Sequence, residues 1–551
     1  MAGKRLAFTG LVVASLFMGD NRKQPVNIAA KPKKAIARTV QQYKEEKHPV
    51  PLIEGHDYKD ILQNPDLIAN NDTLMEKAFL LAAKLDPALI LQHQHLLKHK
   101  LYANDVWRAM AAHADGALRI VQQFNADEET NKSPEVRFAV LKHFDAASDF
   151  DLITHGIQEI FMANYKGILN DMLSKLHKKH QNLTDILSEE QMQRMETFLE
   201  AACDNDRIQD VLKYIPNEEL PKIVDGMAKQ ISSDDLTYAV TISDIMLSLH
   251  DNTKMRGVLE NAIKDHYENE SSQDKKDVFG FIAAIYAKNS HEISHELKPF
   301  FKDTIGNNPR YTITPLAGMT REQLVDRNGD CNQLMVFADD LDSRKSHKHW
   351  VDTYKTKKMR EAGWYTEVDS LYTHIYNTSG KIAVHIRANN PGHYEDGVDA
   401  IKKIIASKNG EIKIFIGRGH SYYAGDARSF ANKSVNFYWD GSCGGEKNIV
   451  KDIKHINPLA QFVGTTGIGM KVVNDLGLSY MNKEIVEKGE FKWNMIMRKI
   501  KSVDSHGKKH YVTPDMNSDQ DLIYAVNKLK LQPKPLGATN YNVKHQNLHT
   551  R

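Results

Sequence analysis

The chain of 551 residues is too long for one ordinary hydrophobic core, so two or three domains of about 100 to 250 residues each are expected. Its 73 lysines and arginines nearly balance its 71 aspartates and glutamates, which excludes a general attraction to nucleic acid or to an anionic membrane as the main basis of partner binding. The three cysteines, Cys203, Cys331 and Cys443, exclude a disulfide framework and leave at least one thiol unpaired in the monomer.

The N-terminal segment has the pattern of an export signal. Lys4 and Arg5 precede an apolar run from Leu6 to Met18, which is too short for a membrane span and suits the core of a signal peptide. We therefore expect residues 1–35 to be a signal-like segment with a linker, and the protein to be secreted or periplasmic. If the segment is instead a buried N-terminal helix, the protein is cytoplasmic. No later segment is apolar for long enough to form a stable membrane span.

Residues 36–310 have the composition and periodicity of an all-helical array. Apolar residues recur at three- and four-residue spacing in "TLMEKAFLLAAKLDPALI" and "DVFGFIAAIYAKNS". Short breaks such as "NKSPE" separate helices of repeat-like length, but no strict period is present. The pattern predicts an irregular solenoid or bundle that acts as a scaffold or binds a protein partner.

The second half of the chain alternates apolar runs of strand length with helical segments. After a linker at residues 311–330, the expected strands are "NQLMVFAD", "KIAVHIRA", "EIKIFIG", "VNFYWDG" and "AQFVG", with helical sequences between them. Such alternation is typical of βαβ units around a mostly parallel sheet. The expected fold class is therefore α + α/β, with the α/β domain at residues 331–510 and a C-terminal helix with a mobile tail at residues 511–551.

A histidine and a cysteine, which can act together as base and nucleophile, follow neighbouring strands of this predicted sheet. His420 comes directly after "EIKIFIGRG", and Cys443 comes directly after "VNFYWDGS". The carboxyl ends of parallel strands meet at one edge of a sheet, so the two side chains are expected at the same rim. A thiol has an ordinary pKa of about 8.5 and needs a neighbouring base to attack a carbonyl near neutral pH. His420 is the candidate base.

These two segments resemble the caspase-like cysteine peptidases, the group that includes caspases, legumains, gingipains and clostripain. In that group an apolar strand ends in His-Gly and the next strand ends in a small residue followed by Cys. Here "IFIGRGHS" and "FYWDGSCGG" are similar to both pieces in the same order, and the resemblance covers about residues 330–500.

The resemblance implies a cysteine peptidase-like hydrolase that cleaves a peptide or protein substrate through a thioester, without a cofactor or metal. It makes Cys443 the nucleophile and His420 the general base and acid. Backbone amides at Ser421, Cys443 and Gly444 are implied as the oxyanion hole. The residue after the histidine is Ser421 here, where the group usually has glycine.

Acidic residues near two other strand ends suggest a substrate pocket. Asp339 and Asp340 follow the first strand, and Asp475 follows the strand after Cys443. In the resembling group, loops at these places help to form the pocket for the residue before the scissile bond, so acids there would suit a basic side chain. The other interpretation is that these residues are exposed turn acids and a helix cap.

Two other functions are compatible with the sequence. One is a catalytically inactive caspase-like protein that serves as an interaction scaffold. The other is a zinc metallopeptidase, because "HEISH" at residues 291–295 matches H-E-x-x-H, which on a helix places two imidazoles on one face. Glu296 and Pro299 follow the motif closely and no third ligand is evident, so the cysteine peptidase is the favoured function.

Overall fold

The structure is a computed structural model, which describes residues 52, 56–68, 71–98, 100–130, 132–157, 159–249, 252–290, 292–419, 427–442, 444–445, 457–466, 469–502 and 511–531. The chain divides into two compact units, residues 1–82 and residues 83–551. The boundary near residue 310 that the sequence predicts does not separate two compact units, because elements from both sides of it pack together in the second unit. The signal-like segment at residues 1–35 lies outside the described residues.

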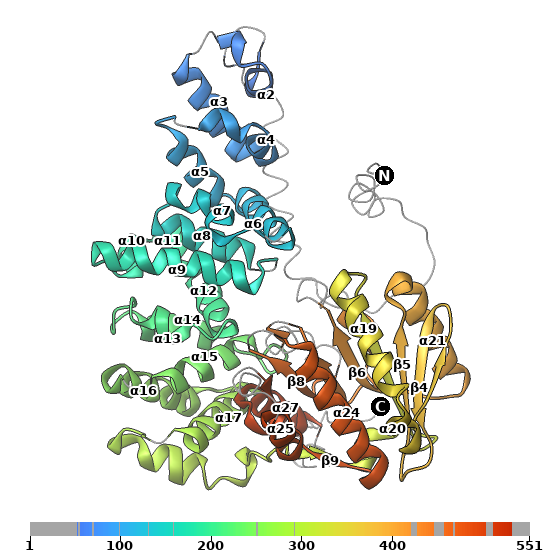
Figure 1. The fold of residues 1–551 in the computed structure, drawn as a ribbon. Coiled ribbons are helices and arrows are strands. Elements are labelled where there is room, and N and C mark those ends of the chain that lie inside the picture. The colour runs from blue at the N-terminus through green and yellow to red at the C-terminus, as the bar shows by residue number, and fades with distance from the viewer. Residues whose placement is uncertain are drawn as a thin grey trace, which may run out of the picture. The chain divides into compact units, whose positions relative to one another are not determined.

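The N-terminal half is helical, as the sequence predicts, and its helices follow one another irregularly (Figure 1). In α14, for example, the buried residues recur at one-, three- and four-residue spacing: Leu220, Ile223, Val224, Met227 and Ala228. The helices of this half are α2 (Tyr58–Gln63), α3 (Asp72–Leu85), α4 (Pro87–His93), α5 (Ala103–Ala112), α6 (Ala114–Glu129), α7 (Pro134–Arg137), α8 (Ala146–Gly156), α9 (Met162–Lys179), α10 (Leu183–Ile186), α11 (Glu189–Met192), α12 (Met195–Asp204), α13 (Ile208–Leu212), α14 (Leu220–Gln230), α15 (Thr237–Ser248), α16 (Thr253–Asn269) and α17 (Gln273–Asn289).

The segment that follows the array is docked on α17 and is not a free linker. Asp277 of α17 accepts hydrogen bonds from Arg310 Nε at 2.6 Å and from the Tyr311 hydroxyl at 3.3 Å. The Tyr311 side chain is buried. The predicted linker at residues 311–330 also holds the short strand β1 (Gly318–Met319) and the helix α18 (Arg321–Leu324), so it is part of the folded unit.

The second half is an α/β domain, which confirms the α + α/β fold class with a mostly parallel sheet. Its further elements are β2 (Asp330–Phe337), α19 (Leu341–Tyr354), α20 (Lys357–Glu361), β3 (Tyr365–Val368), β4 (Tyr372–Asn377), β5 (Ala383–Asn389), α21 (Tyr394–Ser407), β6 (Ile412–Arg418), β7 (Phe437–Asp440), β8 (Gln461–Thr465), α24 (Lys471–Lys488), β9 (Phe491–Lys492), α25 (Trp493–Lys501), β10 (Tyr511–Val512) and α27 (Ser518–Lys530).

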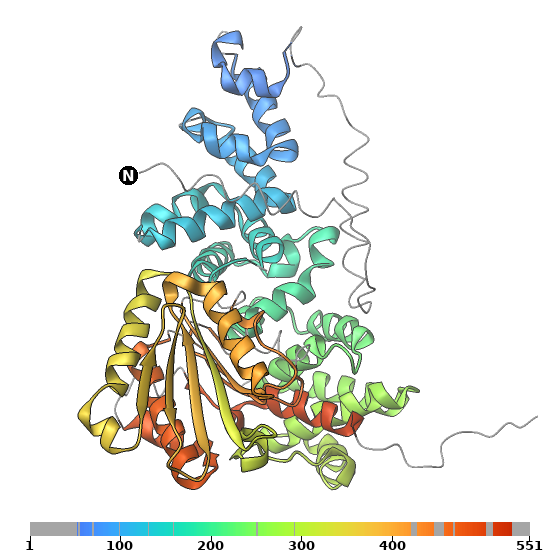
Figure 2. The ribbon, with the colours of Figure 1, turned by 90° about the vertical axis from the view of Figure 1, so that its right-hand side faces the viewer.

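The main sheet has eight strands in the order β10-β8-β7-β6-β2-β5-β4-β3. Figure 2 shows part of this sheet with α-helices beside it. The five inner strands β8, β7, β6, β2 and β5 run parallel, whereas β10 at one edge and the β3–β4 pair at the other edge are antiparallel. The chain places β5 on one side of β2 and then places β6, β7 and β8 on the other side. The order of addition therefore reverses between β2 and β6, and open α/β sheets bind ligands at the carboxyl ends of such a pair.

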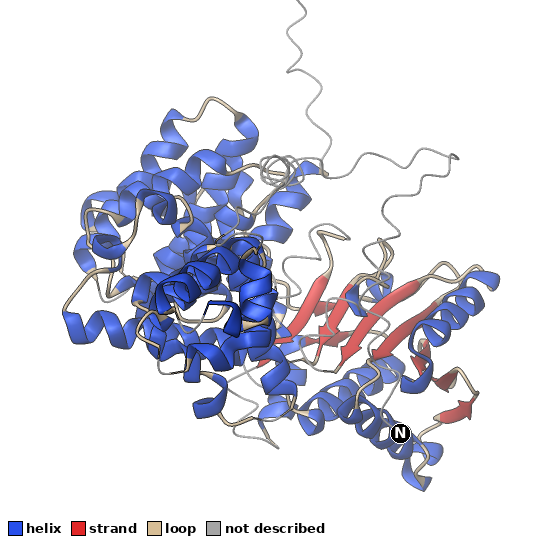
Figure 3. Cartoon of the chain, turned by 90° about the horizontal axis from the view of Figure 1, so that it is seen from above, coloured by secondary structure: helices blue, strands red, loops and turns tan. Residues whose placement is uncertain are grey.

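Helices cover both faces of this sheet (Figure 3). On one face, Trp350 of α19, Met481 of α24 and Ile496 of α25 pack against strand residues such as Trp439. On the other face, α21 contributes its apolar stripe, which includes Ile401. Burial on both faces explains the continuous apolar runs at residues 334–337 of β2 and 414–416 of β6, a pattern typical of inner parallel strands. Asn332 and Gln333 of β2 are buried polar residues, and their side chains are hydrogen-bonded.

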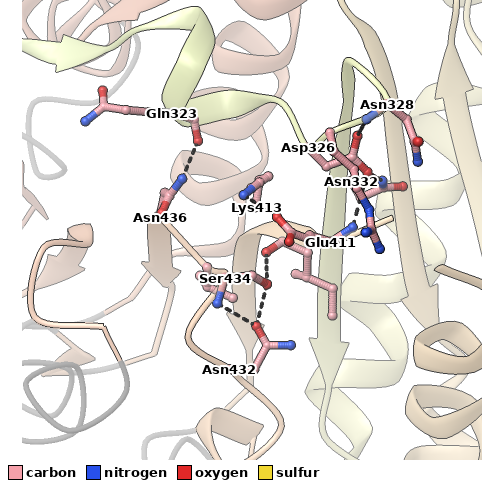
Figure 4. A network of polar contacts seen from close by, with 12 residues as sticks. Gln323, Asp326, Asn328, Asn332, Glu411, Lys413, Asn432, Ser434 and Asn436 are labelled. Atoms are coloured by element: carbon pink, nitrogen blue, oxygen red, sulfur yellow. Dashed lines mark hydrogen bonds and ion pairs between the residues drawn. The ribbon is translucent and has the colours of Figure 1, made fainter. Parts of the chain in front are cut away.

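A polar network fixes the amino ends of the inner strands (Figure 4). The buried Asp326 carboxylate accepts hydrogen bonds from the backbone nitrogens of Asn328 at 2.8 Å and Glu411 at 3.2 Å, and from Asn332 Nδ2 at 2.9 Å. Nearby, Asn436 Nδ2 donates to the Gln323 carbonyl at 2.8 Å. These bonds join the residues that precede β2, β6 and β7, so they tie the amino ends of three inner strands together.

The C-terminal helix α27 contacts both the sheet and the helical array. The Gln520 amide donates to the Phe462 carbonyl at 2.8 Å and its oxygen accepts from the Phe462 nitrogen at 3.0 Å, which attaches α27 to β8. Asp521 pairs with Lys288 of α17 at 2.7 Å. The predicted domain limit at residue 510 therefore falls inside the fold, since β10 and α27 both follow it. The predicted tail from residue 532 onward lies outside the described residues.

Candidate functional site

The predicted site loops begin at one rim of the sheet. β6 and β7 are neighbours and parallel, with Gly417 opposite Asp440 in the register. The Gly441 nitrogen donates to the Gly417 carbonyl at 3.1 Å, so the pairing continues past the end of β7. β2 lies on the other side of β6, and the Ala338 nitrogen donates to the Arg418 carbonyl at 3.2 Å. The carboxyl ends of three inner strands thus meet beside the point where the strand order reverses.

His420, Ser421 and Cys443 lie outside the described residues, but the structure describes the chain that leads to them. β6 ends two residues before His420, and β7 ends three residues before Cys443. Both loops therefore leave adjacent parallel strands at the same rim. Of the predicted oxyanion positions, Gly444 is described and is buried.

Glycines shape both loops because side chains do not fit there. Gly419, directly before His420, has a φ of +149°, and a Cβ atom there would lie 3.0 Å from Ser343 Oγ and 3.2 Å from Ala338 Cβ. Gly444, directly after Cys443, has a φ of +64°, the left-handed region that favours glycine. Glycine at positions 419 and 444 therefore lets the backbone adopt these conformations without strain.

Asp440 organises the start of the loop that carries Cys443. Its Oδ1 accepts a hydrogen bond from the Ser442 nitrogen at 2.9 Å, and its Oδ2 pairs with Arg428 Nη1 at 3.1 Å. A Cβ atom at Gly445 would lie 2.8 Å from the Asp440 carboxylate carbon, so the loop folds back tightly onto this residue. A buried, paired carboxylate at the end of β7 thus determines the path of the chain around Cys443.

Asp475 forms a buried charge cluster at the same rim. The Arg418 side chain is 3% exposed and its Nη1 lies 2.7 Å from Asp475 Oδ1, while His349 Nδ1 lies 2.7 Å from Asp475 Oδ2. The Arg418 guanidinium also lies over the Phe337 ring, 5.6 Å from its centre. Asp475 was predicted to line a pocket for a basic substrate residue, but the protein already supplies that carboxylate with two partners.

The two acids after β2 are also engaged within the protein. Asp340 caps α19, because its Oδ1 accepts from the Ser343 nitrogen at 2.8 Å and its Oδ2 accepts from Ser343 Oγ at 2.7 Å. Asp339 pairs with Arg344 at 2.5 Å, and both side chains are exposed. A basic residue before the scissile bond would therefore have to displace an existing partner rather than meet a vacant carboxylate.

Four residues of this rim were not predicted from the sequence: Arg418, Asp440, Arg428 and His349. Arg418 did carry a signal, since an arginine inside the apolar run "IKIFIGR" is a buried charge that requires a partner. The identity of that partner had no local signal, because Asp475 follows 57 residues later.

His347 provides a pH-sensitive contact beside the rim. Its ring meets the Phe337 ring edge-on at 5.2 Å, and burial lowers the pKa of the imidazole to about 4. The unfolded chain takes up a proton near the ordinary value of 6.5 whereas the folded protein does so only near 4. This contribution to stability is thus fully present above about pH 6.5 and is lost as the pH falls toward 4.

We expect His347→Leu to flatten the acid side of the stability profile. Between pH 7 and pH 4.5 the wild-type histidine contributes about 2 to 3 kcal/mol to the decrease in unfolding free energy, and leucine has no proton to gain. Urea unfolding of both proteins at several pH values measures the difference. An unchanged pH slope in the variant would contradict the assignment of this histidine.

The helix expected for the H-E-x-x-H motif is absent over its described residues, which corrects the premise of the zinc alternative. α17 ends at Asn289, and Glu292, Ile293 and Ser294 are not helical. Glu292 pairs with Arg256 at 3.1 Å and is not held as a base beside a metal. Across the part of the chain that the structure describes, no group of three or more His, Cys, Asp or Glu side chains is arranged to hold a metal ion. His291 itself is outside that part.

Among the described helices, none combines the length and the apolar character that crossing a bilayer requires. Comparison of the chain with protein-family models, with curated proteins and with solved structures found no match.

Proposed function

We propose that the α/β domain is a caspase-like cysteine peptidase in which Cys443 attacks a peptide carbonyl and His420 acts as general base and acid. The observation that supports this proposal best is the adjacent, parallel pairing of β6 and β7, in register up to Gly417 and Asp440. The sequence likeness requires the histidine and cysteine loops to leave neighbouring strands at one rim, and these two strands meet that requirement.

The position of the rim in the sheet gives independent support. The strand order reverses between β2 and β6, and ligand sites in open α/β sheets lie at the carboxyl ends of such a pair. The glycines at positions 419 and 444 allow close approach of backbone to a substrate, and free backbone amides are the usual donors to an oxyanion.

The chemistry follows from these positions. The thiol of Cys443 gives its proton to the His420 imidazole and its sulfur bonds to the carbonyl carbon of the scissile peptide. The imidazolium then protonates the leaving amine, which leaves a thioester on Cys443. Water, deprotonated by His420, releases the acid product. The helical array is proposed to bind a substrate or another protein, and export is proposed from the N-terminal segment.

A thiol-directed alkylating probe tests the dyad. We expect Cys443 to react with it at pH 7 faster than Cys203 and Cys331, which are both buried. Burial also raises the pKa of the Cys331 thiol to about 12, so this thiol is not ionised near neutral pH. Mass spectrometry of digested protein identifies the labelled cysteine.

The variant His420→Ala distinguishes an activated thiol from one that is merely accessible. Without its base, Cys443 should return to a pKa of about 8.5, so labelling at pH 7 should slow at least tenfold while labelling at pH 9.5 should change little. His95→Ala, an exposed histidine of the array, serves as the control. Equal labelling of Cys443 in wild type and His420→Ala would instead favour an inactive caspase-like scaffold.

A further inference from the structure

A cavity lies in the α/β domain along α24, and no residue of β6 or β7 lines it. Its volume is about 860 Å³, which is within the range of small-molecule sites. It is bounded by α20, the turn between β4 and β5, α24 and the end of α25. Figure 1 labels α20 and α24, the two helices that form its long walls.

The cavity is elongated because one face of α24 lines it over three turns. The lining residues of this helix start at Leu476 and end at Glu487, with Ser479, Tyr480 and Lys483 between them at three- and four-residue spacing. Eleven residue steps of about 1.5 Å give a length of roughly 16 Å. A compact ligand such as a single inorganic ion would leave most of this length empty.

The interior surface of the cavity is largely apolar and aromatic. Trp364, which is 4% exposed, and Val486 form its deeper part. Met359 and Tyr480, both partly buried, pack against the hydrophobic core and also line the cavity. An apolar body of a ligand would therefore be removed from water along most of its length.

The charged residues of the cavity are mostly cationic. They are Lys358, Lys381, Lys483 and Lys499 against Glu487 alone, a formal excess of three positive charges. Lys483 lies 3.7 Å from Glu487 and is partly neutralised by it. Within the described part of the chain, the other three ammonium groups form no ion pair. They come from three separate elements, so an acidic group in the cavity has several cations to meet.

We propose that this cavity binds an anionic amphiphile, a molecule with an extended apolar body and an acidic head group. The apolar lining of the cavity would contact the body of the ligand, and the exposed lysines that line the cavity would pair with its head group. The proposal does not depend on the peptidase activity. A neutral or cationic molecule of the same length lacks the complementary charge, and a free anion lacks the buried body.

Calorimetric titration of the full chain with decanoate, below its micelle concentration, tests the proposal. We expect one saturable site per chain, with quenching of tryptophan fluorescence because Trp364 lines the cavity. Decyltrimethylammonium, which has the same chain and the opposite charge, and inorganic phosphate should each bind at least tenfold more weakly. Equal binding of the cation, or tighter binding of phosphate alone, would overturn the proposal.

Variants locate the site. Lys381→Gln with Lys499→Gln should weaken decanoate binding at least fivefold, whereas Lys254→Gln, an exposed lysine of α16, should leave binding unchanged. Ala362→Trp, at an exposed lining position, should block the cavity without altering the core. Binding that survives this variant with a normal thermal unfolding midpoint would show that decanoate binds elsewhere and would refute the assignment.

Discussion

Replacement of Cys443 by alanine should reduce peptide hydrolysis by about 10⁴-fold or more. In the proposed mechanism the thiolate forms the only covalent bond to the substrate, so alanine at this position removes the nucleophile. Fluorogenic peptides varied at the residue before the cleaved bond provide the assay, because they also reveal the preferred residue. The thermal unfolding midpoint should change little, since β7 ends at Asp440 and the replacement removes a single sulfur atom beyond that strand.

The other two cysteines are the matched controls. Cys203→Ala should keep full turnover, because this thiol lies in α12 of the helical array. Cys331→Ala should lower stability somewhat, because the side chain is fully buried in the sheet core, but should not change turnover of the folded fraction. Hydrolysis that persists in Cys443→Ala would show that the activity has another source and would leave the interaction-scaffold function as the better explanation.

Replacement of Arg418 by methionine should destabilise the protein by about 3 to 5 kcal/mol. The guanidinium is the closest cation to the buried Asp475 carboxylate, and methionine would leave that charge with His349 as its remaining partner. The apolar stem of methionine preserves much of the packing against Phe337. The free energy of unfolding from urea titration at pH 7 measures the effect.

Two further variants show whether the loss comes from an uncompensated charge. The double variant Arg418→Met with Asp475→Leu should recover part of the stability, because no charge then remains buried. Arg344→Met removes the partner of Asp339 in an exposed pair and should cost less than about 1 kcal/mol. If the double variant were less stable than the sum of the two single losses, the ion pair could not be the cause.

The inner strands were predictable because their environment is uniform. β2 and β6 are buried on both faces along almost their whole length, and each contains a short apolar run bounded by turns and helical segments. The β3–β4 pair was missed because it lies at the sheet edge and carries polar residues. Burial alternates along β4, but the buried residues are Thr373, Ile375 and Asn377, so the sequence carries no apolar alternation that would reveal the strand.

Contacts between distant segments had no local signal. The order of the strands and the pairing of Arg418 with Asp475 depend on how the chain returns to the rim. The cap formed by Asp340 is local, and it agrees with the helix cap that the sequence offered as one interpretation of these acids. The sequence placed Asp475 correctly after the strand that follows Cys443, but a spacing pattern does not reveal that a carboxylate is already compensated. The helix expected for residues 291–295 was wrong for a local reason, since two histidines at four-residue spacing do not by themselves make a helix.

The position of α27 has a consequence for the order of folding during synthesis. Lys288 of α17 and Asp521 of α27 are separated by 233 residues, and the apolar side of α27 packs on α15 and α17. At ribosomal rates of about 5 to 20 residues per second, α17 is synthesised roughly 10 to 50 seconds before α27. During that interval an apolar surface of α15 and α17 stays open to water and to chaperones. The first half of the chain to be made is therefore among the last to complete its fold.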